Sequence, residues 1–229
     1  MRNLSLPKQS ASLQRNVFIL NLLNRNDGSL HNDEIRESVC DKFLINSSKD
    51  SSMLGKQDEL SRYFGLIHYD TQSKIKYLTE FGRLFLSSQN LEDKGRVILN
   101  YILDSNSHFG INNSAVPRSQ SNLQPPVIFL RLIDELKYIC MKEFAFTLKN
   151  NFDLDTAVHD IKNYRAKQKE TEPLKFLKKF SSSTFPAFLE KLKIIKSQKK
   201  IGSQTKQYFF NSTMDSETLN RLRKTACQI

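Results

Sequence analysis

Residues 60–86, LSRYFGLIHYDTQSKIKYLTEFGRLFL, decide the fold, because within them the spacing of apolar residues changes from helical to extended. A helix predicted over residues 53–64 ends at Gly65. Residues 66–69 and 74–78 then read as two strands joined by a polar turn, and the second of them alternates clearly. Thr79 is a typical N-cap residue and predicts one further helix over residues 80–87. The stretch therefore predicts a helix, a β-hairpin and a second helix in direct succession.

Two more helices are predicted upstream of this stretch. The first ends at the turn Asp27-Gly28, and the second starts at Asn32 or Asp33 as N-cap. The polar residues 46–52 supply a turn with capping serines. The helical spacing is set by Leu13, Val17, Leu20, Leu23, Ile35, Val39 and Phe43. Three helices followed by a hairpin is the order of a winged helix-turn-helix, so residues 1–88 are predicted to form a first winged-helix module.

A similar order recurs near the C-terminus. Helices are predicted around residues 176–180 and 185–192, separated by the serine-rich turn 181–184. Residues 194–195 and 208–210 read as two strands that flank a lysine-rich turn over residues 197–206, and a last helix is predicted over residues 215–226. Residues 166–229 are therefore predicted to form a second, basic winged-helix module.

Residues 89–165 show no convincing strand pattern and are predicted to form an all-helical connecting module. Its helices carry apolar stripes, and the polar residues 108–126 form a long loop of a kind that is often functional. The predicted fold class is thus mainly α with small β-hairpins, in which tandem winged helix-turn-helix modules are joined by a helical module.

Positive charge is concentrated in the last of these segments. The 229 residues contain 35 Lys and Arg against 24 Asp and Glu, a net charge of +11. The segments 1–88, 89–165 and 166–229 carry +2, 0 and +9, counted from the same sequence. A local basic region is typical of proteins that bind polyanions, because phosphate neutralisation releases condensed counterions. A solvated lysine face is the alternative interpretation of the charge alone.

Other classes of protein are disfavoured by composition. The longest apolar run is far shorter than the ~20 residues a bilayer requires, so we expect no membrane association and a cytoplasmic location. Cys40, Cys140 and Cys227 are widely separated, which argues against a disulfide framework or a cysteine-built zinc site. The four histidines, at positions 31, 68, 108 and 159, show no metal-ligand spacing.

The predicted modules suggest how DNA would be contacted. An α-helix fits the major groove, where Gln pairs with adenine and Lys or Arg with guanine, while wing lysines reach phosphates. Double-stranded DNA is therefore the predicted partner. The candidate contact residues in the first module are Ser51, Ser52, Lys56, Gln57, Ser61, Arg62, Lys74 and Lys76. Those in the second module are Ser182, Ser183, Thr184, Lys191, Lys193, Lys199, Lys200 and Lys206. Alternatively, the serines are only helix caps and the charges a solvated face.

Residues 124–165 resemble the centre of the AlwI-like type IIS restriction and nicking endonucleases. The resemblance rests on a Pro-led apolar helix after Pro126, on Met141-Lys142-Glu143-Phe144, and on a helix that starts at Asp153 and ends near Arg165. Residues 60–86 and 185–200 are similar to the recognition wings of such enzymes. The resemblance implies that the chain recognises a short DNA site.

Enzymes of that family cut with a C-terminal, magnesium-dependent PD-(D/E)xK nuclease domain. The sequence stops near where that domain would begin, so no catalysis is expected from this chain alone. Two internal matches to the short pattern, Glu135-Leu136-Lys137 and Asp160-Ile161-Lys162, lie in stretches predicted to be helical. We therefore expect no cofactor for this chain, and magnesium only if a nuclease domain or subunit is present in cis or in trans.

Two other functions remain open. The modules could form a winged-helix transcription regulator or protein-interaction module without nuclease association, or the chain could contain an unrecognised internal nuclease site. Salt-dependent DNA binding separates the first alternative from the main hypothesis, and magnesium-dependent plasmid nicking tests the second.

Overall fold

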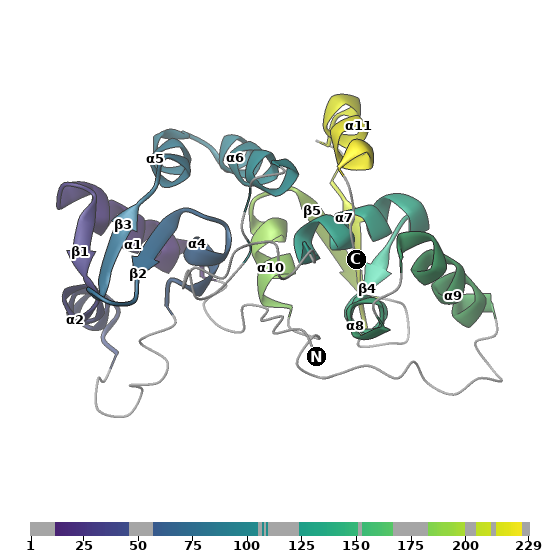
Figure 1. The fold of residues 1–229 in the computed structure, drawn as a ribbon, viewed down its shortest axis with the longest axis horizontal. Helices are drawn as coiled ribbons and strands as arrows, with labels where there is room; N and C mark the ends of the chain where they lie inside the picture. The colour runs from purple at the N-terminus through teal and green to yellow at the C-terminus, as the bar shows by residue number, and fades with distance from the viewer. Residues whose placement is uncertain are drawn as a thin grey trace. The chain divides into compact units, whose positions relative to one another are not determined.

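The computed structural model describes residues 12–45, 57–104, 107, 109, 124–150, 153–166, 183–199, 205–211 and 214–225. These residues are mainly helical and include two small three-stranded antiparallel sheets (Figure 1). The chain divides into two compact units. The first unit comprises residues 7–118, and the second comprises residues 119–229 with residues 1–6.

The first unit has a sheet whose strand order is β1-β3-β2. In this sheet Leu30 pairs with Lys76, and Ile67 pairs with Leu78. Its elements are α1 (Leu13–Arg25), β1 (Ser29–His31), α2 (Asn32–Phe43), α4 (Glu59–Tyr63), β2 (Ile67–Asp70), β3 (Ile75–Leu78), α5 (Glu80–Ser87) and α6 (Leu91–Leu103).

Local signals explain where these helices begin. Thr79 accepts a hydrogen bond from the Gly82 amide and so caps α5 as predicted. α2 starts one residue earlier than expected, because His31 is its N-cap and forms a capping box with Glu34. α1 and α2 are held together in part by an edge-to-face contact of Phe18 with Phe43, ring centroids 5.5 Å apart.

The second unit has a sheet with the strand order β4-β6-β5. Phe129 lies at the centre of its core and makes edge-to-face contacts with Phe144, Phe185 and Tyr208. Its elements are α7 (Pro125–Leu136), β4 (Ile139–Cys140), α8 (Met141–Asn150), α9 (Leu154–Ala166), α10 (Thr184–Lys191), β5 (Ile195–Lys199), β6 (Lys206–Phe210) and α11 (Ser216–Lys224).

The two units repeat one order of elements. A helix, a short strand, a helix, a short helix, a two-stranded hairpin and a further helix occur in this order in both. The first unit has α6 as an additional helix after these elements, and the second has α9 as an additional helix before α10. The first short strand pairs with the second hairpin strand in each sheet. The amide of His31 binds Glu34 at the end of β1, and the amide of Cys140 binds Glu143 at the end of β4.

The hairpins of the two units are also in register. Ile67 pairs with Leu78 in the first, and Ile195 pairs with Phe210 in the second. The next residue along the chain, Thr79 or Asn211, donates its amide to the carbonyl that precedes the hairpin, at Leu66 or Ile194. Equivalent positions in the two units can therefore be assigned from hydrogen bonds alone.

The structure corrects the predicted boundaries in two ways. The second unit includes α7, β4 and α8, which were expected in an all-helical connecting module over residues 89–165. That segment contains the strand β4, and α6 packs against α5 in the first unit. The predicted division was 1–88, 89–165 and 166–229, whereas the two compact units divide the chain after residue 118.

The second hairpin is longer than predicted. Ser197, Gln198 and Lys199 continue β5, and Lys206 and Gln207 begin β6, whereas residues 197–206 were expected to form a turn. The short strands β1 and β4, of three and two residues, were not predicted. The helix predicted over residues 53–64 is described only from Gln57 onward, and the one predicted over 176–180 lies outside the described residues.

Candidate nucleic-acid interface

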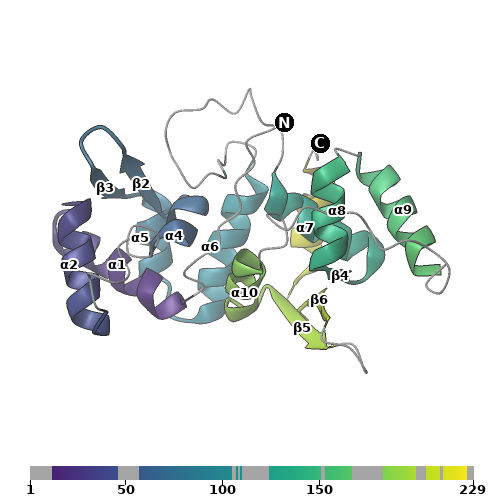
Figure 2. The same cartoon turned by 90° about the horizontal axis from the view of Figure 1, so that it is seen from below.

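Exposed lysines gather on α10 and on the hairpin of β5 and β6, which lie side by side in the second unit (Figure 2). Lys191 ends α10, and Lys193 occupies the turn that leads into the hairpin. These two are joined by lysines on both strands, so that the exposed set consists of Lys191, Lys193, Lys196, Lys199 and Lys206. We call this set the lysine surface. Lys200, a further predicted contact, lies outside the described residues.

Strand alternation places these lysines. Ile195 and Tyr208 are buried on the core face of the hairpin, and Lys196, which follows Ile195, is exposed on the opposite face. Lys199 and Lys206 lie on the same face as Ile195 and Tyr208 and are exposed at the end of the hairpin. Lys199 is paired directly with Lys206 at the far end of the ladder. Two like charges at directly opposed positions repel one another and lower the stability of a hairpin. An anion near the pair reduces this repulsion.

One carboxylate lies within the lysine surface. Glu190, in the last turn of α10, accepts hydrogen bonds from the Ser197 amide at 3.1 Å and from the Ser197 hydroxyl at 2.6 Å. Its other oxygen is 3.9 Å from the Lys206 ammonium. Burial, together with the nearby Glu190 charge, raises the pKa of Tyr208 to about 12, so this phenol remains protonated.

The start of α10 carries two of the predicted contacts. Ser183 is exposed at the N-cap position and makes no side-chain capping hydrogen bond, and Thr184 is half-buried at the first helical position. Ser182 lies outside the described residues. The two described residues stand at the opposite end of α10 from Lys191, so the helix presents hydroxyl groups at one end and cations at the other.

The predicted contacts of the first unit are placed differently. Gln57, Ser61, Arg62 and Lys76 are all buried, with exposed fractions of 5% or less. Gln57 accepts a hydrogen bond from Arg15, and Ser61 donates one to the buried Asn16. These side chains are used inside the unit and are not presented to a groove. Ser51, Ser52 and Lys56 lie outside the described residues, and Lys74 is exposed in the hairpin turn.

Arg62 and Lys76 belong to a buried ionic cluster. The Asp58 carboxylate is 2.8 Å from the Lys76 ammonium and 3.2 Å from Nε of Arg62. The Tyr69 ring lies 5.4 Å from the Lys76 ammonium and 5.6 Å from the Arg62 guanidinium carbon. Burial lowers the pKa of Lys76, an effect that Asp58 partly opposes. The cluster joins α4 to both hairpin strands.

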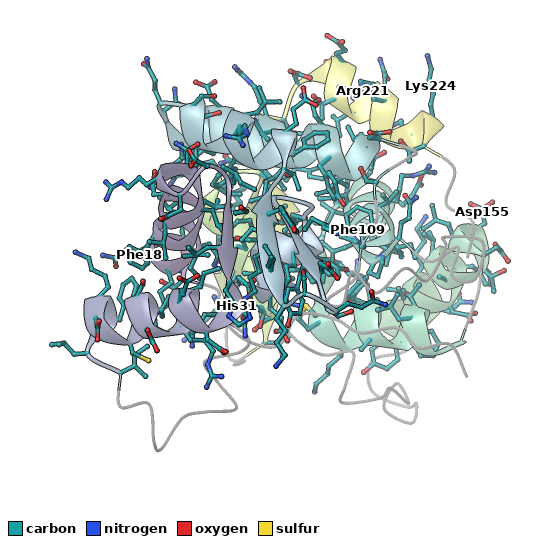
Figure 3. All side chains as sticks on the ribbon, turned by 60° about the vertical axis from the view of Figure 1, so that its left-hand side comes forward. Phe18, His31, Phe109, Asp155, Arg221 and Lys224 are labelled. Atoms are coloured by element: carbon teal, nitrogen blue, oxygen red, sulfur yellow. The ribbon has the colours of Figure 1, made fainter. Side chains whose placement is uncertain are left out.

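A further basic group, absent from the predicted DNA contacts, lies in the last turn of α11. Arg223 forms two hydrogen bonds with Asp134 of α7, at 2.7 and 2.9 Å, and this holds α11 on α7. Arg221 and Lys224 are exposed and project from α11 (Figure 3). Basic residues in the last helical turn were a visible signal, although one that helix-dipole stabilisation also explains.

The two short matches to a nuclease pattern lie in helices, as predicted. Glu135 is in the last turn of α7, Lys137 follows as its C-cap with φ 67°, and Asp160 and Lys162 both lie in α9. Within the described residues, no three side chains of the metal-ligating types come together to form a metal site. In the same part of the chain, no helix has the length and apolar character needed to span a bilayer.

Arg165 and Glu143 instead form a structural junction in the second unit. Arg165 donates to both Glu143 oxygens at 2.8 and 2.9 Å and to the Leu136 and Tyr138 carbonyls, and its guanidinium stacks 3.8 Å from the Tyr138 ring centroid. The additional helix α9 is thereby fixed to α8 and to the residues that precede β4.

Comparison with known proteins gives no assignment. No protein-family model matches the sequence, and no curated protein matches it at a significant level.

Proposed function

We propose that the chain binds double-stranded DNA and that the lysine surface of the second unit grips the phosphate backbone. The observation that carries the proposal is the direct pairing of Lys199 with Lys206 on a hairpin whose strand β5 and preceding helix and turn expose three further lysines. Two like charges in such a pairing repel one another, and Glu190 offsets this only in part because it lies near Lys206 and not near both lysines. Phosphate would offset the rest.

The proposal includes a winged-helix architecture for both units. It is supported by the order of elements and by the strand orders β1-β3-β2 and β4-β6-β5, in which the hairpin follows the third main helix. In this interpretation α10 is the groove-facing helix of the second unit, and the β5–β6 hairpin is its wing. Ser183 and Thr184 at the start of α10 would then lie towards the bases, and the lysines towards the backbone.

In this proposal the two units have different roles in DNA binding. The positions equivalent to Lys193 and Lys196 are Gly65 and His68 in the first unit, where the register and the turn hydrogen bonds match. The described part of α4 is also buried. The sequence-independent grip is therefore assigned to the second unit, and any base contact by the first unit is assigned to surfaces other than Gln57, Ser61 and Arg62.

The biological role that fits this activity best is target recognition in a type IIS restriction or nicking endonuclease. This part of the proposal rests on the resemblance of residues 124–165, 60–86 and 185–200 to that family. Cleavage would come from a magnesium-dependent nuclease domain or subunit in cis or in trans. The helical settings of Glu135 and Asp160 support the view that the described residues do not themselves cut.

Binding to labelled duplexes tests the proposal. Anisotropy titrations of a random duplex at several salt concentrations should show an affinity that falls steeply with salt, and selection from a random pool should then enrich one short site. A salt-independent or absent affinity would instead favour a winged-helix module that binds protein. Magnesium-dependent nicking of plasmid by the chain alone would contradict the assignment of cleavage to another domain.

A further inference from the structure

Glu190 stands alone as an acidic residue in the most basic part of the sequence. Between Leu174 and Met214 it is the single acidic residue among nine lysines. The structure places it at the junction of α10 and the hairpin, with its side chain 33% exposed and the partner Lys206 49% exposed. A carboxylate at this point repels the phosphates that the surrounding lysines attract.

Glu190 and its equivalent in the first unit, Arg62, both connect a helix to the hairpin that follows it. We call this position the helix–hairpin contact. The Glu190 carbonyl accepts the Lys193 amide, and the Arg62 carbonyl accepts the Gly65 amide at the equivalent turn. Glu190 then binds Ser197 on β5, and Arg62 lies over Tyr69, the equivalent residue on β2.

The residue at the helix–hairpin contact has opposite charge in the two units: Arg62 in the first and Glu190 in the second. A cation occupies this contact in the unit whose hairpin lacks the lysine surface, and an anion occupies it in the unit that carries this surface. The hydrogen bonds to Ser197 need an acceptor at position 190, which a neutral glutamine also supplies. The contact with Ser197 therefore explains why an acceptor is present but does not require its negative charge.

We infer that Glu190 limits sequence-independent DNA binding, because its charge neutralises Lys206 and opposes phosphate at the α10–hairpin junction. This inference rests on the proposed function. Lys206 is then a weaker phosphate ligand than Lys199, although the two are paired on the hairpin and both are exposed. Glu190 would act as a specificity-determining residue: it lowers affinity for all DNA and leaves a larger share of binding to base contacts.

The test compares Glu190→Gln with wild type in anisotropy titrations of a random duplex between low and high salt. Glutamine keeps an acceptor for Ser197 and removes the charge. Gain of one phosphate contact should steepen the slope of log affinity against log salt by about 0.9, equivalent to about eightfold tighter binding at 0.1 M salt. The gain should disappear when Lys206→Ala is added to Glu190→Gln.

Two control variants test whether a gain in DNA affinity comes from the Glu190 charge in particular and not from removal of any negative charge. Glu217→Gln removes a negative charge from the first turn of α11, outside the lysine surface, and should change affinity much less. Ser197→Ala removes the hydroxyl contact and keeps the Glu190 charge, so it should not tighten binding. An equal gain from Glu217→Gln, or no gain from Glu190→Gln, would overturn the inference.

A second comparison leaves Glu190 intact, and so does not depend on the folding of its variants. In the wild-type background Lys206→Ala should weaken binding less than Lys199→Ala. Equal losses, or a larger loss for Lys206→Ala, would contradict neutralisation by Glu190. If wild type binds DNA in a salt-dependent way and the two variants lose equal affinity, the inference about Glu190 is overturned but the proposed function stands. If neither wild type nor any variant binds DNA, the proposed function is overturned as well.

Discussion

Lys199 and Lys206 face each other as directly opposed residues at the end of the β5–β6 ladder. Like charges at such positions repel, and opposed pairs of this kind change hairpin stability by about 0.2–1 kcal/mol. The pairing therefore lowers the stability of the free protein, although by less than an isolated pair would, because Glu190 lies 3.9 Å from the Lys206 ammonium. In the proposed function it is retained because the same two charges bind DNA phosphates.

The first prediction concerns this pair. Lys199→Gln should leave stability unchanged or raise it by a few tenths of a kcal/mol, and it should weaken binding to random and preferred duplexes alike, by about eightfold at 0.1 M salt. Urea denaturation and anisotropy measure the two effects. Lys74→Gln, in the turn of the other hairpin, is the matched control and should leave affinity nearly unchanged. A loss confined to the preferred duplex would contradict a backbone role for Lys199.

The second prediction concerns the junction of Arg165 and Glu143. Arg165→Ala removes both bonds to Glu143 and leaves a carboxylate whose side chain is 6% exposed without its charged partner. The expected loss is about 3 kcal/mol in the free energy of unfolding, measured by urea denaturation. Arg96→Ala removes an exposed partner of Asp93 and should cost less than about 1 kcal/mol. Similar losses for the two variants would show that the junction contributes little.

The third prediction uses the pH dependence of Lys76. Because burial lowers its pKa in the folded state, the unfolded chain binds this proton more readily between the lowered pKa and 10.5. Stability from this group therefore rises as pH increases through that window. Lys76→Met should remove the rise, so the stability of wild type minus that of the variant should increase towards alkaline pH.

Paired urea denaturations of wild type and Lys76→Met at neutral and alkaline pH measure this difference. Lys74→Met serves as the control, since it removes an exposed lysine from the same hairpin. A difference that stays constant or falls with pH would show that Asp58 outweighs burial in setting the charge state of Lys76.

Part of the fold could be predicted from local sequence. Thr79 as the cap of α5, Asp153 as the cap of α9, and the hairpin after Gly65 follow from side-chain chemistry within a few residues, and the structure confirms them. The strands β1 and β4 could not be predicted, because two or three residues show no periodicity. Their pairing with β3 and β6 depends on contacts distant in sequence.

The sequence indicates which residue types the candidate site contains, but not which of their side chains are exposed. The lysines near residue 199 were visible as a charge cluster, yet their place on strands and not in a turn follows from pairing with β6. Gln57 and Arg62 have the chemistry of base-reading residues, and nothing local indicates their burial. Gln57 is bound by Arg15, which is 42 positions away in the sequence. Arg62 binds Asp58 one helical turn away, and this pair is joined by Lys76 from β3, a contact that only the folded chain brings about.

DNA binding by the lysine surface is tested by the salt dependence of random-duplex binding for two proteins. One is wild type, and the other is a variant with Lys191, Lys193, Lys196, Lys199 and Lys206 changed to Gln. Wild-type affinity should fall steeply with salt, and the slope should be reduced by up to about 4.5 in the variant, since each of the five lost phosphate contacts removes about 0.9. Equal slopes for the two proteins, with the variant folded by circular dichroism, would contradict a DNA grip by the lysine surface.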